Sequence, residues 1–183
     1  RCKIMEKKKI SPIRTVLVLT CICAVISLLV AGVYALTKDT IAQNNEKKTE
    51  KAISEIFPNY TEKTAVSGEF DEKINALYKV TSDAVSGYAV DVTAKGYGSD
   101  GINMMVGIDD TGKIISVVIV SATSETPGLG QNITKPQYTD GFKGLTAGQK
   151  ADTISGATIS SNGVQAGIDA CLSAVEQASK GAK

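Results

Sequence analysis

The stretch Ile102–Thr123, "INMMVGIDDTGKIISVVIVSAT", contains two runs rich in β-branched and other apolar residues. Asp110, Thr111 and Gly112 separate the two runs, and a short break of this composition is typical of a β-hairpin. Two earlier runs, "NALYKVTS" (75–82) and "GYAVDVTAKG" (87–96), have the same strand-like character. We therefore predict an antiparallel sheet built from these four segments.

The C-terminal stretch that follows predicts a helix. In "SSNGVQAGIDACLSAVEQASK" (160–180), apolar residues recur at the spacing of one helical face: Val164, Ile168, Cys171 or Leu172, and Val175. An antiparallel sheet with helices packed on it is an α+β fold, and this is the fold class that we expect for the C-terminal part.

The N-terminal part has a different character. Thr15–Leu36, "TVLVLTCICAVISLLVAGVYAL", is a run of 22 residues without a charge. As a helix it would be about 33 Å long, which matches the roughly 30 Å hydrocarbon core of a bilayer. The alternative is a cleaved secretory signal, but its apolar region is typically about 7–15 residues long. A retained transmembrane helix is the favoured interpretation.

Charge predicts how this helix is oriented. Residues 1–14 hold six Lys or Arg and one Glu, a balance of +5, although the whole chain carries only +1. The positive-inside rule places this segment in the cytoplasm and the rest of the chain across the membrane. A broken apolar stripe continues the helix to Phe57, Pro58 ends it, and 61–73 is read as a polar connection. The predicted organisation is a basic cytoplasmic segment (1–14), a transmembrane helix (15–36), a helical stalk and linker (37–72) and an extracytoplasmic domain (73–183).

Composition argues against several functions. The chain has no histidine, so the commonest general base and imidazole metal ligand are missing. It has no tryptophan and few aromatics, and its net charge is close to zero, which argues against nucleic-acid binding. Cys171 is the one cysteine expected outside the membrane on the far side, so no disulfide is predicted there, and we predict no metal site.

The segment "DTISGATIS" (152–160) precedes the C-terminal helix and is rich in small and hydroxyl residues. Ser160, Ser161 and Asn162 are good N-cap residues, and the N-terminus of a helix favours a bound anion such as phosphate. Gly156 and Ala157 would let a ligand approach the backbone closely. From the residues alone, the alternative is a capped turn that binds nothing.

A second loop, "SETPGLGQNI" (124–133), is also rich in glycine and lies between regular elements. Leu129 stands between Gly128 and Gly130, so its side chain would be exposed at a loop tip unless something covers it. A flat apolar ligand would cover it, and so would the core of the domain. A generic loop remains the alternative.

Together the two segments are more specific. Asp152-x-x-Ser155-Gly156-Ala157-Thr158 resembles the flavinylation motif of the FMN-binding domain family, and Glu125–Gly130 resembles a second signature of that family. With its single N-terminal membrane helix, the chain resembles the RnfG family, the G subunits of the Rnf complexes, which are ion-translocating ferredoxin:NAD⁺ oxidoreductases. The C subunits of the sodium-translocating NADH:quinone oxidoreductases form a related family.

This resemblance implies a cofactor and a site. FMN would be attached through its phosphate to the hydroxyl of Thr158, as a phosphothreonyl diester made by a separate flavin transferase. Asp152 would be read by the transferase or would orient the turn, and the flavin ring would lie against Leu129 and the backbone of 126–130. The implied cofactor-binding residues are Thr158, Ser155, Gly156, Ala157, Asp152, Glu125, Thr126, Gly128, Leu129 and Gly130.

The resemblance also implies a role. The chain would be the electron-relay subunit of a translocase, single-pass in the inner (plasma) membrane, with the other Rnf subunits and membrane lipid as partners. Two alternatives stay open. One is a membrane-anchored covalent-FMN domain of another redox system, either NADH:quinone oxidoreductase-like or an extracellular reductase. The other is a module without redox chemistry that binds a phosphorylated ligand at the anion site.

Overall fold

The computed structural model describes residues 12–82 and 85–181, and the chain divides into a unit up to Asn45 and a unit from Glu46 onward. Residues 1–11 of the predicted basic segment, with Cys2, therefore lie outside the described residues. The elements are α1 (Pro12–Ile56), β1 (Tyr60–Ala65), β2 (Ile74–Ser82), β3 (Ser86–Ala94), β4 (Ile102–Asp109), β5 (Ile114–Ser121), the 3₁₀ helix η1 (Gly130–Thr134), α2 (Pro136–Thr139), the 3₁₀ helix η2 (Asp140–Phe142) and α3 (Thr158–Gly181).

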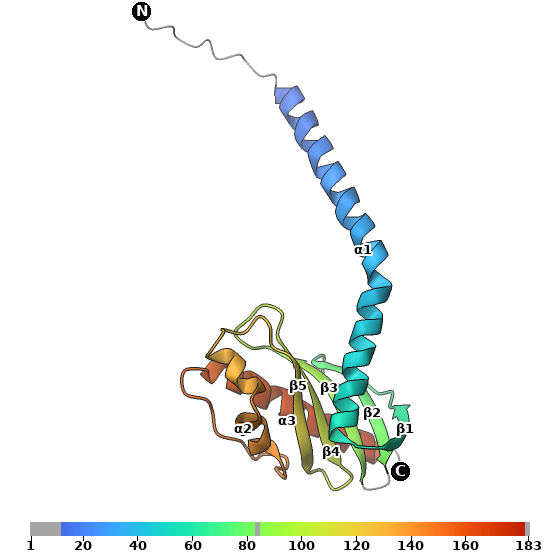
Figure 1. The fold of residues 1–183 in the computed structure, drawn as a ribbon, viewed down its shortest axis with the longest axis vertical. Helices are drawn as coiled ribbons and strands as arrows, with labels where there is room; N and C mark the ends of the chain where they lie inside the picture. Colours follow the sequence, from blue (N-terminus) through green and yellow to red (C-terminus); the bar gives the residue numbers. More distant parts are fainter. Residues whose placement is uncertain (1–11, 83–84, 182–183) are drawn as a thin grey trace, which may run out of the picture. The chain divides into compact units, whose positions relative to one another are not determined.

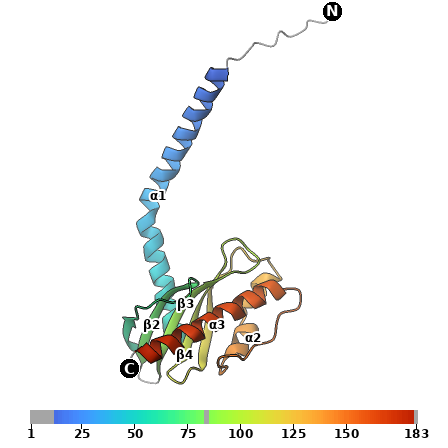
Figure 2. The same cartoon turned by 180° about the vertical axis from the view of Figure 1, so that it is seen from behind.

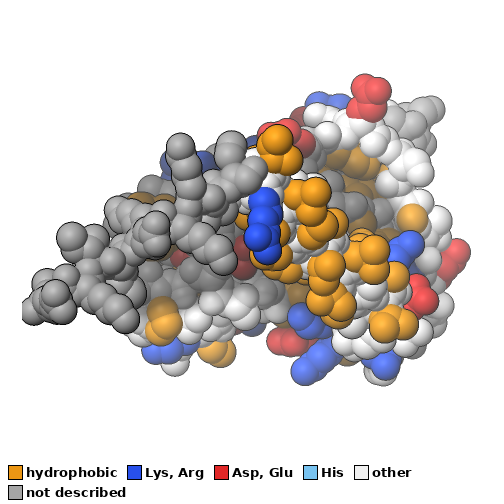
Figure 3. All heavy atoms as spheres, turned by 90° about the horizontal axis from the view of Figure 1, so that it is seen from above, with side chains coloured by type: hydrophobic (Ala, Val, Ile, Leu, Met, Phe, Trp, Pro, Cys, Tyr) orange, Lys and Arg blue, Asp and Glu red, His pale blue; other side chains and the backbone are white. Residues whose placement is uncertain are grey.

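Helix α1 begins the described chain (Figure 1). Its apolar side chains between Ile13 and Leu36 are exposed, and hydrophobic side chains gather on the exposed surface seen from above (Figure 3). Among the described residues, α1 is the one helix long and apolar enough to cross a membrane. The predicted continuation beyond residue 36 is confirmed, because the helix runs unbroken to Ile56 and ends before Pro58.

The second unit is built on a five-stranded antiparallel sheet in the order β1-β2-β3-β4-β5. The four predicted strands are confirmed as β2 to β5. The predicted hairpin joins β4 to β5, with Gly112 at a positive φ of 84°. Burial pushes the pKa of Asp109 upward, but hydrogen bonds from Thr111 and Lys113 outweigh it and hold that pKa below its ordinary value.

The segment read as a polar connection contains a fifth strand, which corrects the sequence prediction. Tyr60–Ala65, "YTEKTA", pairs with β2 at the edge of the sheet. All six of its residues are exposed or only partly buried, so the strand has no continuous apolar face that the sequence could reveal. The compact unit that contains the sheet begins at Glu46, so it includes the last turns of α1 and strand β1.

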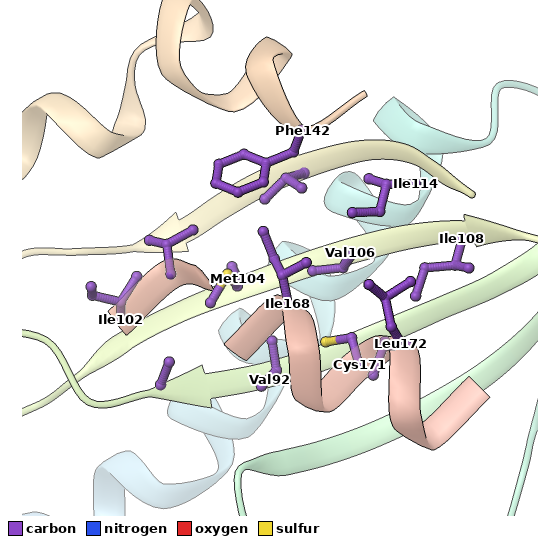
Figure 4. Close-up of a cluster of buried hydrophobic side chains, with 14 of the residues drawn as sticks. Val92, Ile102, Met104, Val106, Ile108, Ile114, Phe142, Ile168, Cys171 and Leu172 are labelled. Atoms are coloured by element: carbon purple, nitrogen blue, oxygen red, sulfur yellow. The ribbon is translucent and has the colours of Figure 1, made fainter. Parts of the chain in front are cut away.

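Each face of the sheet is covered by a helix (Figures 1 and 2). One face carries α3, and Ile168, Cys171 and Leu172 point from that helix toward the strands (Figure 4). The other face is covered by the last turns of α1, where Ile53 and Ile56 pack with residues of the sheet. The predicted apolar stripe of the C-terminal helix is thus confirmed as a core face, and the α+β fold class with it.

The alternating directions of strand residues explain this two-sided core. The neighbouring residues Met104 and Met105 of β4 are both fully buried, but they belong to the α3 side and the α1 side respectively. A strand covered on both faces, such as β4, therefore reads as a nearly continuous apolar run. The last turns of α1, which we predicted as a stalk, cover one of the two faces of this strand.

The described cysteines are free: Cys21 and Cys23 are exposed on α1, and Cys171 is buried on the sheet side of α3. Burial raises the pKa of the Cys171 thiol well above its usual range, and the Asp91 carboxyl adds to this effect. The thiol stays protonated at neutral pH, so Cys171 acts as a small core residue.

Candidate functional site

Three segments that are distant in the sequence meet at the N-terminal end of α3. They are the loop between β3 and β4, the loop after β5 that leads into η1, and the turn before α3. Between them lies an open pocket of about 320 Å³, which is at the small end of the range for small-molecule sites. Its lining residues are Tyr97, Thr126, Leu129, Gly130, Gly156, Ala157, Thr158, Ile159 and Ser160.

The two loops singled out in the sequence are in contact. Gly156 adopts a positive φ of 80°, and a Cβ placed on it would lie 3.3 Å from a methyl carbon of Leu129. Leu129 is not covered by the core of the domain, because 48% of the residue is exposed at the pocket. The structure therefore leaves Leu129 available to pack against a ligand.

Thr158 is the first residue of α3, and its side chain is exposed at the pocket. The first N–H groups of this 24-residue helix have no partner within the helix and give this end a partial positive charge. The hydroxyl of Thr158 makes no hydrogen bond within residues 12–82 and 85–181. An exposed hydroxyl oxygen therefore lies where the helix favours an anion.

The N-cap prediction is wrong, because α3 begins before Ser160, Ser161 and Asn162. Ser160 and Ser161 lie within the first turns of the helix and are buried. The hydroxyl of each already takes part in a hydrogen bond to another segment. Ser160 donates a hydrogen bond to Glu125, while Ser161 accepts one from the backbone N–H of Ile154. From inside the helix, the Ser161 side chain thus holds the turn before α3, and the Ser160 side chain holds the loop after β5.

Glu125 is buried, with 1% of its surface exposed. One carboxyl oxygen accepts a hydrogen bond from the backbone N–H of Gly98 at 3.0 Å, and the other accepts one from the Ser160 hydroxyl at 2.5 Å. In the described part of the chain, no Lys or Arg side chain pairs with it. The single side chain of Glu125 thereby joins the loop after β5 to the loop between β3 and β4 and to the first turn of α3.

The structure brings together six of the ten residues predicted to bind the cofactor: Thr126, Leu129, Gly130, Gly156, Ala157 and Thr158 line the pocket. Glu125 lies behind the wall, with its carboxyl group turned to Gly98 and Ser160. Asp152, Ser155 and Gly128 are exposed and are not among the lining residues. Gly128 adopts a positive φ of 76° with open space around it, so its backbone conformation alone favours glycine.

Tyr97 and Ile159 line the pocket and were missed by the sequence analysis, and Ser160 was assigned only as a cap. The sequence did carry a signal for Tyr97, which lies between Gly96 and Gly98 as Leu129 lies between Gly128 and Gly130. Both are large residues at tightly turned loops, but only the tertiary structure shows that the two loops meet.

Two larger hollows fit an anion less well. One, of about 460 Å³, includes Leu172, Val175 and Glu176 from the C-terminal half of α3, where the helix end carries partial negative charge. The other, of about 710 Å³, is formed by 66–77 and carries Glu69, Asp71 and Glu72. No group of three His, Cys, Asp or Glu residues in the described chain could hold a metal ion.

Known proteins match both parts of the chain. The FMN-binding domain family matches residues 96–173, and the RnfG N-terminal region matches residues 5–56. The G subunit of an ion-translocating oxidoreductase complex from Methanosarcina acetivorans is 33% identical, covering 91% of this chain and 94% of the relative. The G subunit of a proton-translocating ferredoxin:NAD(+) oxidoreductase complex from Clostridium ljungdahlii is 30% identical over 87% of each chain. The G subunit of an ion-translocating oxidoreductase complex from Haemophilus influenzae is 32% identical over 78% of each.

Proposed function

Because the chain belongs to the family of G subunits of ion-translocating oxidoreductase complexes, we propose that it relays electrons within such a complex through an FMN attached to Thr158. Apart from the site of attachment, the chain is an electron-transport flavoprotein subunit with an FMN-binding domain. The observation that carries the proposal is the convergence of Thr158, Gly156 and Leu129 on one pocket at the start of α3.

The residues of the pocket fit FMN. The N-terminal end of α3 suits a phosphodiester, which keeps one negative charge. Leu129, Ile159 and Tyr97 are exposed apolar or aromatic side chains that a flat ring could cover. Once bound, FMN supplies the electron-transfer chemistry, and the protein orients it and sets its surroundings.

Covalent attachment would be made at the threonine oxygen. A flavin transferase would join the FMN phosphorus to the Oγ1 of Thr158, with loss of the hydroxyl proton and of the leaving group of an activated FMN donor. The exposure of Thr158 makes its oxygen accessible to such an enzyme. Thr153 and Ser155 are also exposed, but neither lines the pocket.

The covalent link and the relay role are tested by two measurements on the full chain. Protein produced together with a flavin transferase should show a flavin absorption band that persists after denaturation and separation from small molecules. Purification from its native membrane should also bring other flavin and iron–sulfur subunits. A flavin that is released on denaturation would refute the covalent link, and purification without redox partners would favour the alternative of a membrane-anchored FMN domain in another system.

We further propose that α1 anchors the chain in the plasma membrane, with the domain outside the cytoplasm. Protease added to intact cells should then cleave the chain after Lys38 and leave an epitope tag before residue 1 intact, because the basic segment favours the cytoplasmic side. Immunoblotting for the tag and for the domain measures both outcomes. A domain that is protected until the membrane is permeabilised would contradict this orientation.

A further inference from the structure

Tyr97 is an exposed aromatic side chain at the edge of the pocket. It lies in the loop between β3 and β4, and 68% of the residue is exposed. From Glu46 onward, the large hydrophobic residues that are exposed in the described chain are Val85, Tyr97, Leu129 and Ile159, and the last three line this pocket. Exposed apolar groups gathered at one hollow indicate a surface that a ligand covers.

The backbone that carries Tyr97 is held firmly in place. The N–H of Gly98 donates to the buried carboxyl of Glu125. A Cβ at Gly96 would overlap that carboxyl, and a Cβ at Gly98 would overlap the carbonyl oxygen of Ser124. Glycine is required on both sides of Tyr97, because the loop lies directly against the segment that leads to Leu129. Tyr97 is thus an exposed ring on a closely packed backbone.

We propose that Tyr97 is the aromatic wall of the flavin site, with its ring packed against the isoalloxazine ring of the FMN attached to Thr158. This inference rests on the proposed function. Leu129 and Ile159 supply aliphatic contacts in the same pocket, whereas Tyr97 alone among the lining residues supplies an aromatic face. Aromatic rings attract one another in offset or edge-to-face arrangements, beyond the effect of the area that they bury.

Fluorescence of the attached flavin tests this contact directly. A tyrosine ring in contact with an excited flavin gives it one electron and takes the electron back without emission, so the fluorescence is quenched. Phenylalanine has the same shape but is too difficult to oxidise to act in this way. The measurement is the ratio of flavin fluorescence in the folded full chain to that after denaturation, and intact mass reports separately how much FMN is attached.

Wild type should carry the adduct and be strongly quenched when folded, and Tyr97→Phe should carry the same adduct with a several-fold higher ratio. Tyr78→Phe is the matched control, since Tyr78 belongs to the opposite face of the sheet and should stay as quenched as wild type. Tyr138→Phe tests a buried tyrosine near the start of α3. The hydroxyl of Tyr138 donates a hydrogen bond to the backbone carbonyl of Ser161, which lies in the first turns of that helix.

Each result supports or overturns the assignment. An unquenched wild type, an unchanged ratio in Tyr97→Phe, or a rise in Tyr138→Phe in its place would overturn it while the adduct mass remained. An absent adduct in wild type would instead refute the proposed function on which the inference rests.

Discussion

Thr158→Ala should abolish attachment of the flavin while leaving the fold intact. The substitution removes a hydroxyl at the first residue of α3 that is exposed, makes no hydrogen bond within the described chain and lines the pocket. Because the side chain is exposed, the free energy of unfolding should change by no more than about 0.5 kcal/mol. Intact mass and in-gel flavin fluorescence measure the result in full-length protein produced together with the transferase.

Wild type should be heavier than the unmodified chain by one FMN less one water, and Thr158→Ala should show the unmodified mass. Thr158→Ser keeps an oxygen in the same place and should retain part of the adduct. Ser155→Ala is the matched control, since Ser155 offers an exposed hydroxyl three residues earlier that lies outside the pocket. If Thr158→Ala kept the adduct and Ser155→Ala lost it, the assignment of the attachment residue would be wrong.

The strands and helices that the sequence predicted correctly are those whose apolar residues face a partner. Val164, Ile168 and Leu172 of α3 and the apolar runs of β4 and β5 fall on buried faces, so composition and spacing report their structure. Strand β1 escaped prediction because it is a polar edge strand, held by backbone pairing to β2 rather than by a buried face. Its sequence carries the signature of a loop.

The start of α3 was misplaced for a related reason. Ser160, Ser161 and Asn162 have the composition of an N-cap, but a cap prediction assumes that the side chain returns to its own helix. Here the Ser160 hydroxyl is directed to Glu125, which is 35 residues earlier in the chain. No local pattern contains such a partner, so the sequence could identify the two loops of the site but not the interaction that joins them.

Glu125→Ala should destabilise the domain more than any substitution of an exposed glutamate. The change leaves the partly buried backbone N–H of Gly98 and the buried hydroxyl of Ser160 without their acceptor, and a fully buried group without a partner costs about 1–3 kcal/mol. It also empties the space of a fully buried side chain. We expect a loss of about 2–4 kcal/mol, which would lower the Tm of a domain of this size by roughly 10 °C.

Glu125→Gln separates hydrogen bonding from charge. Its amide oxygen can accept from Gly98, and its amide nitrogen can donate to the Ser160 oxygen once that hydroxyl rotates. Most of the stability should therefore return in this variant. Glu176→Ala is the control, because Glu176 is exposed and pairs only with Lys180 at the surface, so the Tm should change little. Thermal unfolding of the full chain in detergent measures all three variants.

The double variant of Glu125 and Ser160 shows whether the two side chains act together. If the hydrogen bond between them joins the loop to α3, the destabilisation caused by Glu125→Ala and Ser160→Ala together should be smaller than the sum of the two separate effects. Additive effects would mean that Glu125 acts through Gly98 or by filling space alone. Leu129 and Thr158 lie on the two segments that this hydrogen bond connects. If the two side chains act together, their loss should therefore also reduce flavin attachment, although neither Glu125 nor Ser160 supplies the attachment oxygen.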